Sequence, residues 1–321
     1  MSVKHMIPGY DEFADKYSPN IDNRANIHCF VLGLMIIIVA KQSITAKVSK
    51  RSLVRGNLVD HEDKIIDIRH GQFQVELLQG GTGPTLVYLH GASGHAGWSP
   101  FLDHLAQSFR IIAPVQPGVG NSTGLEHLDT LWDLIIFYED LIHELDLETL
   151  YLCGDDYGGM VAVELAAHCP RLIPRLALTA PFGIWIDDTP TLDIFALTPS
   201  ERKHLEWFNP QNEPASNLLI QEDDQIGILE QELVNTQTAQ AIGKFMWPIA
   251  DHGLIKRAHR ITMPTLLIWG DSDQIIPLPY AYAFQNLLPN SELTIIEQCG
   301  HLPHLERPRD YCNALTKFLS T

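Results

Sequence analysis

The chain has 321 residues, of which 45% are hydrophobic and 19% are charged, a composition typical of an ordinary globular protein and far from that of a disordered chain. Its 39 acidic and 22 basic residues give a formal net charge of −17, which repels phosphate backbones and anionic membrane surfaces. We therefore expect no nucleic-acid partner and no firm membrane partner. The length allows one domain with an insertion as naturally as two domains.

The cysteines are odd in number and scattered, without a CxxC pair. This spacing predicts neither a disulfide framework nor a zinc site, so a reducing compartment is the simpler interpretation and we expect a cytoplasmic protein. The five are Cys29, Cys153, Cys169, Cys299 and Cys312.

One N-terminal segment, Ile27 to Ala40, is apolar enough to resemble a membrane anchor. It has only 14 residues, whereas crossing a bilayer takes about 20. The residues before it hold four acids and three bases, the wrong sign for the start of a signal peptide. We interpret it as a buried strand or helix of an N-terminal extension over residues 1–60, with membrane association through this segment as the alternative.

From residue 61 the sequence alternates short apolar runs with longer amphipathic stretches, the pattern of βα units on a mostly parallel sheet. In chain order, the pattern predicts two strands within 64–78 that meet at a turn around His70, a strand at 85–91, a helix at 98–109, a strand at 110–118, a helix at 127–145, a strand at 149–154, a helix at 160–168, and further strands at 175–181, 264–270 and 292–297.

Between residues 182 and 261 this rhythm breaks into segments rich in proline and acids, followed by a helical stretch at 228–243. We interpret 182–261 as a lid inserted into one core domain, whose two parts are 61–181 and 262–321.

A strand gives way to a helix at residues 151–159 (YLCGDDYGG). Gly154 and Gly158 stand two residues before and two residues after Asp156, the spacing of a nucleophile elbow, in which backbone approaches backbone closely. Asp155 lacks such neighbours and is interpreted as a flanking residue. Asp156 is therefore the candidate nucleophile.

This elbow and two later motifs resemble those of the α/β-hydrolase family, and the resemblance extends over residues 61–321. The segment GDDYGG matches the family's G-x-nucleophile-x-G-G, IWGDSDQIIP (268–277) is similar to its G-x-x-D-x-x-x-P, and QCGHLPHLERP (298–308) to its G-H-x-P-x-x-E-x-P. The resemblance implies an α/β fold with a mostly parallel central sheet flanked by helices. It also implies Asp273, rather than Asp271, as the acid of a catalytic triad.

The same resemblance implies that His301, rather than His304, is the base of the triad. It further implies an oxyanion hole built from main-chain N–H groups, one from Tyr157 and one from the turn HGASG (90–94), where Ala92 is the candidate.

An aspartate at the nucleophile position limits the chemistry. Attack of Asp156 on an ester or amide would give a mixed anhydride, whereas attack on the sp³ carbon of an epoxide or alkyl halide gives an ordinary alkyl ester. His301, oriented by Asp273, would then activate the water that hydrolyses this ester. Family members with aspartate here are typically epoxide hydrolases and dehalogenases, so we expect such a hydrolase, with a small-molecule substrate, water and no cofactor.

Other features favour a different branch of the family. The chain has HGASG where epoxide hydrolases have HGxP, and no tyrosine lies between Tyr157 and Tyr280. Trp185, Trp207 and Trp247 could bind a halide, although apolar packing in the lid is the simpler interpretation. The turn, the acid loop and the lid look more like those of serine esterases and carbon–carbon bond hydrolases. The alternative hypothesis is therefore an inactive scaffold with a replaced serine that binds a ligand or a partner.

Overall fold

The computed structural model describes residues 59–321, apart from 96, 212–224 and 250. The segment from Ile27 to Ala40 and almost all of the predicted N-terminal extension lie outside the described residues, so the predictions for them stay predictions. Among the residues that are described, no helix is both long and apolar enough to cross a membrane.

The centre of the described part is an eight-stranded sheet with the order β1-β2-β4-β3-β5-β6-β7-β8. β1 and β2 form an antiparallel hairpin, β2 pairs antiparallel with β4, and all other neighbours are parallel. The strands are β1 (His61–Ile68), β2 (Phe73–Gly80), β3 (Thr85–Leu89), β4 (Arg110–Pro114), β5 (Tyr151–Asp155), β6 (Arg175–Thr179), β7 (Thr265–Gly270) and β8 (Ser291–Ile296).

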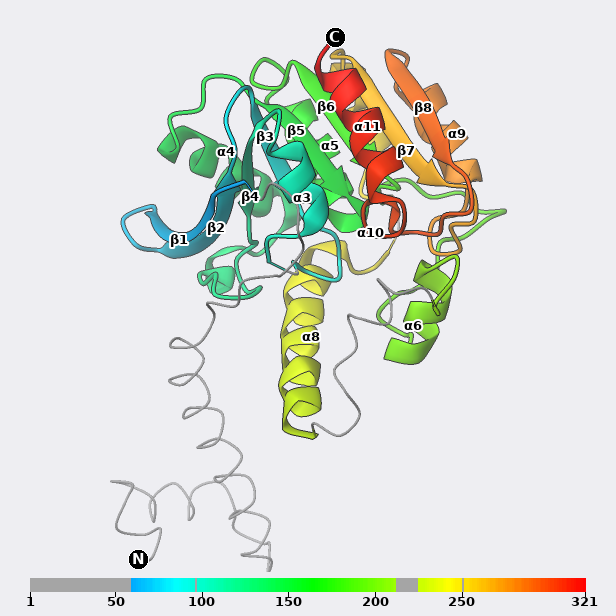
Figure 1. The fold of residues 1–321 in the computed structure, drawn as a ribbon, viewed down its shortest axis with the longest axis horizontal. Helices are drawn as coiled ribbons and strands as arrows, with labels where there is room; N and C mark the ends of the chain where they lie inside the picture. Colours follow the sequence, from blue (N-terminus) through cyan, green and yellow to red (C-terminus); the bar gives the residue numbers. More distant parts are fainter. Residues whose placement is uncertain (1–58, 96, 212–224, 250) are drawn as a thin grey trace, which may run out of the picture. The chain divides into compact units, whose positions relative to one another are not determined.

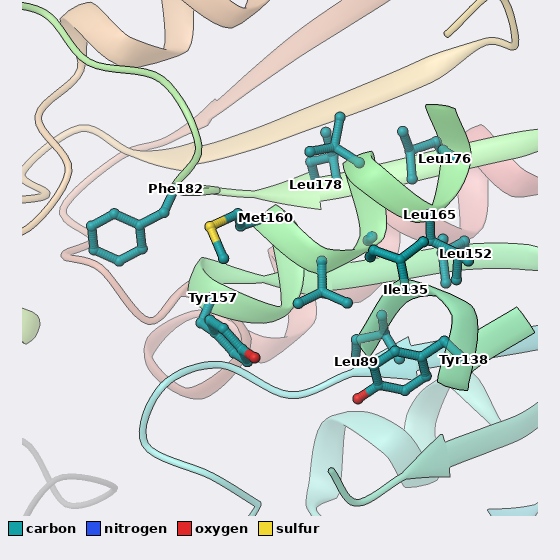
Figure 2. Packing of buried hydrophobic residues seen from close by; sticks show 14 of the residues in the cluster. Leu89, Ile135, Tyr138, Leu152, Tyr157, Met160, Leu165, Leu176, Leu178 and Phe182 are labelled. Atoms are coloured by element: carbon teal, nitrogen blue, oxygen red, sulfur yellow. The ribbon is translucent and has the colours of Figure 1, made fainter. Parts of the chain in front are cut away.

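Helices cover both faces of the sheet (Figure 1). α3 (Pro100–Leu105) and α11 (Pro308–Leu319) pack over one face, where their apolar side chains share a core with Leu86 and Leu266 of the strands. α4 (Leu131–Glu144), α5 (Asp156–His168) and α9 (Pro279–Leu287) contribute to the larger core of the other face. Figure 2 shows this second layer, in which Ile135, Leu152, Leu165, Leu176 and Leu178 are close-packed.

This architecture confirms the predicted mostly parallel sheet flanked by helices. Several helix boundaries differ from the prediction, and two of these differences have a visible local reason. α4 begins at Leu131 rather than 127, because Thr130 caps it: its hydroxyl accepts the N–H of Asp133 while the Asp133 carboxylate accepts the N–H of Thr130. α5 begins at Asp156 rather than 160, because the elbow itself forms the first turn of the helix.

The predicted insertion at 182–261 contains α6 (Pro199–Glu206), α8 (Gln225–Met246) and two short 3-10 turns, Leu254–Lys256 and Ala258–Arg260. Figure 1 shows α6 and α8 beyond the edge of the sheet at which α10 (Pro303–Glu306) lies. A lid role for this insertion is a proposal that its position supports.

Candidate active site

The candidate nucleophile Asp156 sits in a strained turn between β5 and α5. Its φ is 55°, a left-handed conformation that residues other than glycine rarely adopt. A Cβ at Gly154 would lie 2.3 Å from the carbonyl oxygen of Gly158, and a Cβ at Gly158 would lie 2.2 Å from that of Leu89. These close approaches are the physical reason for the glycine spacing noted in the sequence.

The two carboxylate oxygens of Asp156 have different surroundings. Oδ2 accepts a hydrogen bond from the main-chain N–H of Ala92 at 2.8 Å. Oδ1 lies 3.5 Å from Nε2 of His301, and neither of these buried atoms has another hydrogen-bond partner within the described residues. One oxygen is thus held in place, while the other remains available for chemistry.

His301 is held by Asp273 on its far side. The Nδ1 of His301 lies 2.7 Å from Oδ2 of Asp273, whose other oxygen accepts the N–H groups of Ile275 and Ile276 at 2.9 Å each. These bonds set the orientation of the Asp273 carboxylate and, through it, that of the imidazole ring. The structure therefore brings together Asp156, His301 and Asp273, all three of the predicted triad residues.

His301 lies between two carboxylates in a buried environment. Burial alone would lower the pKa of His301, but the charges of Asp273 and Asp156 outweigh it and raise this pKa well above its ordinary value. The two carboxylates therefore favour the protonated form of the His301 ring.

The two rejected candidates, Asp271 and His304, have other partners. The Asp271 carboxylate accepts the main-chain N–H groups of Gln298 and Cys299, and so ties together two loops beside the site. The ring of His304 lies 3.0 Å from a carboxylate oxygen of Asp155. The carboxylates that contact the His301 ring in the described structure are those of Asp273 and Asp156.

His90 supports the turn that carries Ala92. Burial lowers the pKa of His90 to about 4, so the ring is neutral near pH 7. Its Nε2 accepts the N–H of Gln116, which places the ring proton on Nδ1, 3.0 Å from the carbonyl oxygen of Gly91. The ring thus connects the end of β4 to the turn beside Asp156.

Comparison with known proteins agrees with this fold. Residues 86–315 match the model of a family described as the alpha/beta hydrolase family. The chain belongs to this family.

The relatives of this alpha/beta hydrolase in sequence include enzymes with different substrates. Pimeloyl-[acyl-carrier protein] methyl ester esterase of Nitrosomonas europaea is 29% identical over 251 residues, which cover 72% of this chain and 94% of the esterase. The 2-hydroxymuconate semialdehyde hydrolase of a Pseudomonas species is 26% identical over 262 residues, covering 77% of this chain and 90% of that enzyme.

Solved structures support the same fold. The structure of 2-hydroxy-6-oxo-6-phenylhexa-2,4-dienoate hydrolase from a Rhodococcus species superposes with a TM-score of 0.68 at 20% identity, covering 82% of this chain and all of that chain. A similarity at this level of identity shows the fold alone.

Asp155, which the sequence marked only as a flanking residue, is the centre of a buried network in this alpha/beta hydrolase. Its carboxylate accepts the hydroxyl groups of Tyr88 at 2.8 Å and Tyr311 at 3.1 Å, and lies 3.0 Å from the His304 ring. Burial would raise the pKa of Asp155, but the charge of His304 and the hydrogen bonds lower it. The sequence does contain one signal for this pairing, the acid directly before Asp156 and the second histidine three residues after His301.

The insertion contacts the loop that carries His301. The main-chain N–H of His301 donates to the carbonyl oxygen of Glu206 at the end of α6, at 2.7 Å. The Glu306 carboxylate accepts the N–H groups of Phe208 and Gly300, each at 2.8 Å. These bonds join the insertion directly to the candidate active site.

A second contact of α6 reaches the oxyanion turn. Arg202 pairs with Glu206 on the same helix and donates to the hydroxyl of Ser93, 2.9 Å away. Ser93 directly follows Ala92, so α6 touches both the histidine loop and the turn that carries the Asp156 hydrogen bond.

The tryptophans of the insertion have different environments. Trp207 is buried and packs against Leu302, as apolar packing predicts. Trp185 donates its indole N–H to Asp187 at 3.1 Å, so this N–H is already used. Trp247 is 58% exposed, and the packing role predicted for it is therefore wrong.

Tyr157, the predicted second oxyanion donor, stands in the first turn of α5. Its side chain is buried in the larger core near Met160 and Phe182 (Figure 2). The phenol donates to Oε1 of Gln116 at 2.7 Å. The oxyanion role of its main-chain N–H stays a prediction.

Proposed function

We propose that this protein is a hydrolase with Asp156 as its nucleophile, which opens an epoxide or displaces a halide from a small molecule through an alkyl ester of Asp156. The observation that carries this proposal is that the two carboxylate oxygens of Asp156 lie in different surroundings. Oδ2 accepts the Ala92 N–H, while Oδ1 has no hydrogen-bond partner within the described residues and faces His301.

This geometry supports both steps of the reaction. Attack by Oδ1 on an sp³ carbon leaves Oδ2 as the carbonyl oxygen of the new ester, still bonded to the Ala92 N–H. When water adds to the ester carbon, negative charge develops on Oδ2, where Ala92 and the predicted donor Tyr157 would stabilise it. The bond between the acyl carbon and the alkyl-bearing oxygen then breaks, and the departing alcohol takes the proton that His301 removed from water. The carboxyl group loses its remaining proton to solvent, which restores the carboxylate.

Formation of the ester changes the charge of His301 in the direction that the second step, hydrolysis of the ester, requires. Alkylation turns Asp156 into a neutral ester, so one of the two negative charges that raise the pKa of His301 disappears. The pKa of His301 then falls, and the neutral imidazole can remove a proton from water. Asp273 keeps the ring oriented throughout.

The proton on His301 favours an epoxide over a halide. Opening an epoxide generates an alkoxide that must gain one proton, and His301 holds one proton that must leave before the ring can act as a base. A displaced halide ion does not need a proton, so the proton on His301 would have to pass to solvent instead. The Trp185 N–H, one candidate for gripping a halide, is already bonded to Asp187.

The covalent ester provides the test. Purified His301→Ala protein, incubated with panels of epoxides and of alkyl halides, is expected to accumulate an adduct on Asp156, because attack remains possible and hydrolysis does not. Peptide mass spectrometry would locate the adduct. The matched control, His301→Ala with Asp156→Asn, is expected to show none. Complete absence of an adduct across both panels would contradict the proposal.

A second candidate is an inactive scaffold that binds a ligand or a partner. The observation that favours it is the hydrogen bond from the Ala92 N–H to the Asp156 carboxylate. This bond occupies the N–H that an ester substrate would need. If Asp156→Ser produces activity on p-nitrophenyl esters while the native protein forms no adduct, this replaced-serine reading is the better one. Esterase and carbon–carbon bond hydrolase relatives make that outcome chemically reasonable.

A further inference from the structure

A second cluster of reactive side chains lies at the other end of α5. His168 is the last residue of this helix, Cys169 is its C-cap, and Glu139 reaches them from α4. The Nε2 of His168 lies 2.8 Å from one Glu139 oxygen, and the thiol of Cys169 lies 3.4 Å from the other. All three candidate ligand atoms lie within 4.8 Å of one another.

The fold, rather than a local motif, assembles this group. Glu139 stands 29 residues before His168 and 30 before Cys169, so the spacing resembles no metal-binding pattern in the sequence. The packing of α4 against α5 brings them together. Trp132, also on α4, packs edge-on against the His168 ring at a centroid distance of 4.7 Å and an angle of 81°, which restricts the orientation of the ring.

The three donors suit a cation of intermediate softness. A thiolate, an imidazole and a carboxylate are the three ligand types that zinc uses, and tetrahedral bond lengths place neighbouring nitrogen and oxygen ligands about 3.3 Å apart and sulfur and oxygen about 3.6 Å apart. The observed separations, 2.8 Å from His168 to one Glu139 oxygen and 3.4 Å from Cys169 to the other, are shorter than those values, so an ion requires the three side chains to move apart and the carboxylate to turn. The negative end of the α5 dipole adds a favourable field for a cation.

The group is also accessible. The side chains of His168 and Glu139 are 24% and 30% exposed, while Cys169 is 8% exposed overall. An ion can therefore enter from solvent and keep a water as its fourth ligand, with the thiol shielded behind it.

We propose that Glu139, His168 and Cys169 form a binding site for a single thiophilic divalent cation, best matched by zinc. Binding replaces the thiol proton and the proton shared between His168 and Glu139, both of which pass to solvent. No electron transfer is involved. The site lies at the opposite end of α5 from Asp156, about 18 Å along a helix of this length, so it stabilises the α4–α5 contact rather than taking part in hydrolysis.

Cobalt(II) is the suitable probe, because cysteine ligation to it produces a charge-transfer band in the near ultraviolet. The full chain, freed of metal with a chelator, is expected to bind one Co²⁺ with this band and with the visible spectrum of a tetrahedral ion. One equivalent of Zn²⁺ should remove both. Cys169→Ser is expected to lose the charge-transfer band, and His168→Gln or Glu139→Gln to weaken binding about tenfold or more.

Matched controls separate this site from other thiols and from the hydrolase proposal. Cys312→Ser is expected to retain the band, since Cys312 is buried in the core on the other face of the sheet. Asp156→Asn is expected to bind Co²⁺ as the native protein does, whatever the outcome of the adduct test. A native protein without the band, or a band that survives Cys169→Ser, would overturn the site.

Discussion

At the scale of single residues, the charge of His301 links the structure to the proposed mechanism. Asp156 and Asp273 lie on either side of the ring, and their charges raise the pKa of His301 and favour its protonated form. A general base must be neutral, so the histidine becomes competent only after the Asp156 charge has been removed. The proposed ester removes that charge, which makes base activation a consequence of the first step rather than a separate event.

This dependence can be measured without a substrate. Asp156→Asn removes the same negative charge that ester formation would remove, so the pKa of His301 is expected to fall relative to the native protein. Nuclear magnetic resonance of isotope-labelled histidine rings, followed across a pH titration, reports this pKa.

Asp271→Asn is the matched control for that titration, because Asp271 bonds to the main chain of residues 298–299 rather than to the ring. It is expected to leave the pKa of His301 unchanged. An unchanged pKa in Asp156→Asn, or an equal fall in both variants, would show that the Asp156 charge does not control His301.

At the scale of elements, Asp155 joins three parts of the fold. It ends β5, while Tyr88 belongs to β3 and Tyr311 to α11, and His304 lies in α10. Both partners in this buried contact are close in sequence to the candidate catalytic residues, since Asp155 precedes Asp156 and His304 follows His301 by three residues. The pair therefore fixes the distance between the elbow and the histidine loop.

This pair makes stability depend on pH in a defined direction. The lowered pKa of Asp155 means that its charge stabilises the fold above the ordinary carboxyl pKa of about 4 and stops doing so as the pH falls through the lower folded-state value. Asp155→Asn is expected to reduce the free energy of unfolding by about 3 kcal/mol at pH 7, the usual cost of breaking a buried ion pair. The difference from the native protein should shrink in acid.

Urea unfolding at neutral and acidic pH measures both quantities, with the exposed Asp67→Asn on β1 as the control. His304→Gln completes a double-mutant cycle, in which the two changes together should cost less than the sum of their separate costs. A loss that stays constant down to acidic pH would mean that the Asp155 charge contributes nothing and that only its shape matters.

At the scale of the whole molecule, the net charge of −17 means that repulsion among the charged side chains exceeds attraction. Several ion pairs are partly exposed to solvent, such as Arg69 with Asp140 and Lys244 with Asp129, and such pairs contribute little to stability. Added salt screens both the repulsion and these attractive pairs. Because the repulsion is the larger effect, salt should stabilise the fold.

We accordingly expect the Tm to rise when the ionic strength increases from about 0.01 M to about 0.1 M, which shortens the screening length from about 30 Å to about 10 Å. Calorimetry in NaCl and again in KCl would measure the shift and separate screening from binding of a particular ion. A Tm that falls with salt would show that attractive ion pairs outweigh the excess of acidic charge.

The sequence by itself determined the sheet, the elbow and the choice of triad residues. Short apolar runs predicted all eight strands from 61 onward, because the side-chain periodicity of a strand or a helix can be read from neighbouring residues. The glycines around Asp156 selected it over Asp155, since a turn this tight leaves no room for a Cβ at Gly154 or Gly158. The motifs around Asp273 and His301 selected residues that the fold indeed brings into contact.

Only the tertiary structure decided which distant side chains meet. Asp155 pairs with Tyr311 across 156 residues of chain, and Glu139 meets His168 across 29, through helices and strands whose order in space no local pattern encodes. The contact of α6 with the His301 loop has the same origin. Such contacts depend on strand order and on the packing of helices against the sheet, because burial drives those elements together without regard to their separation along the chain.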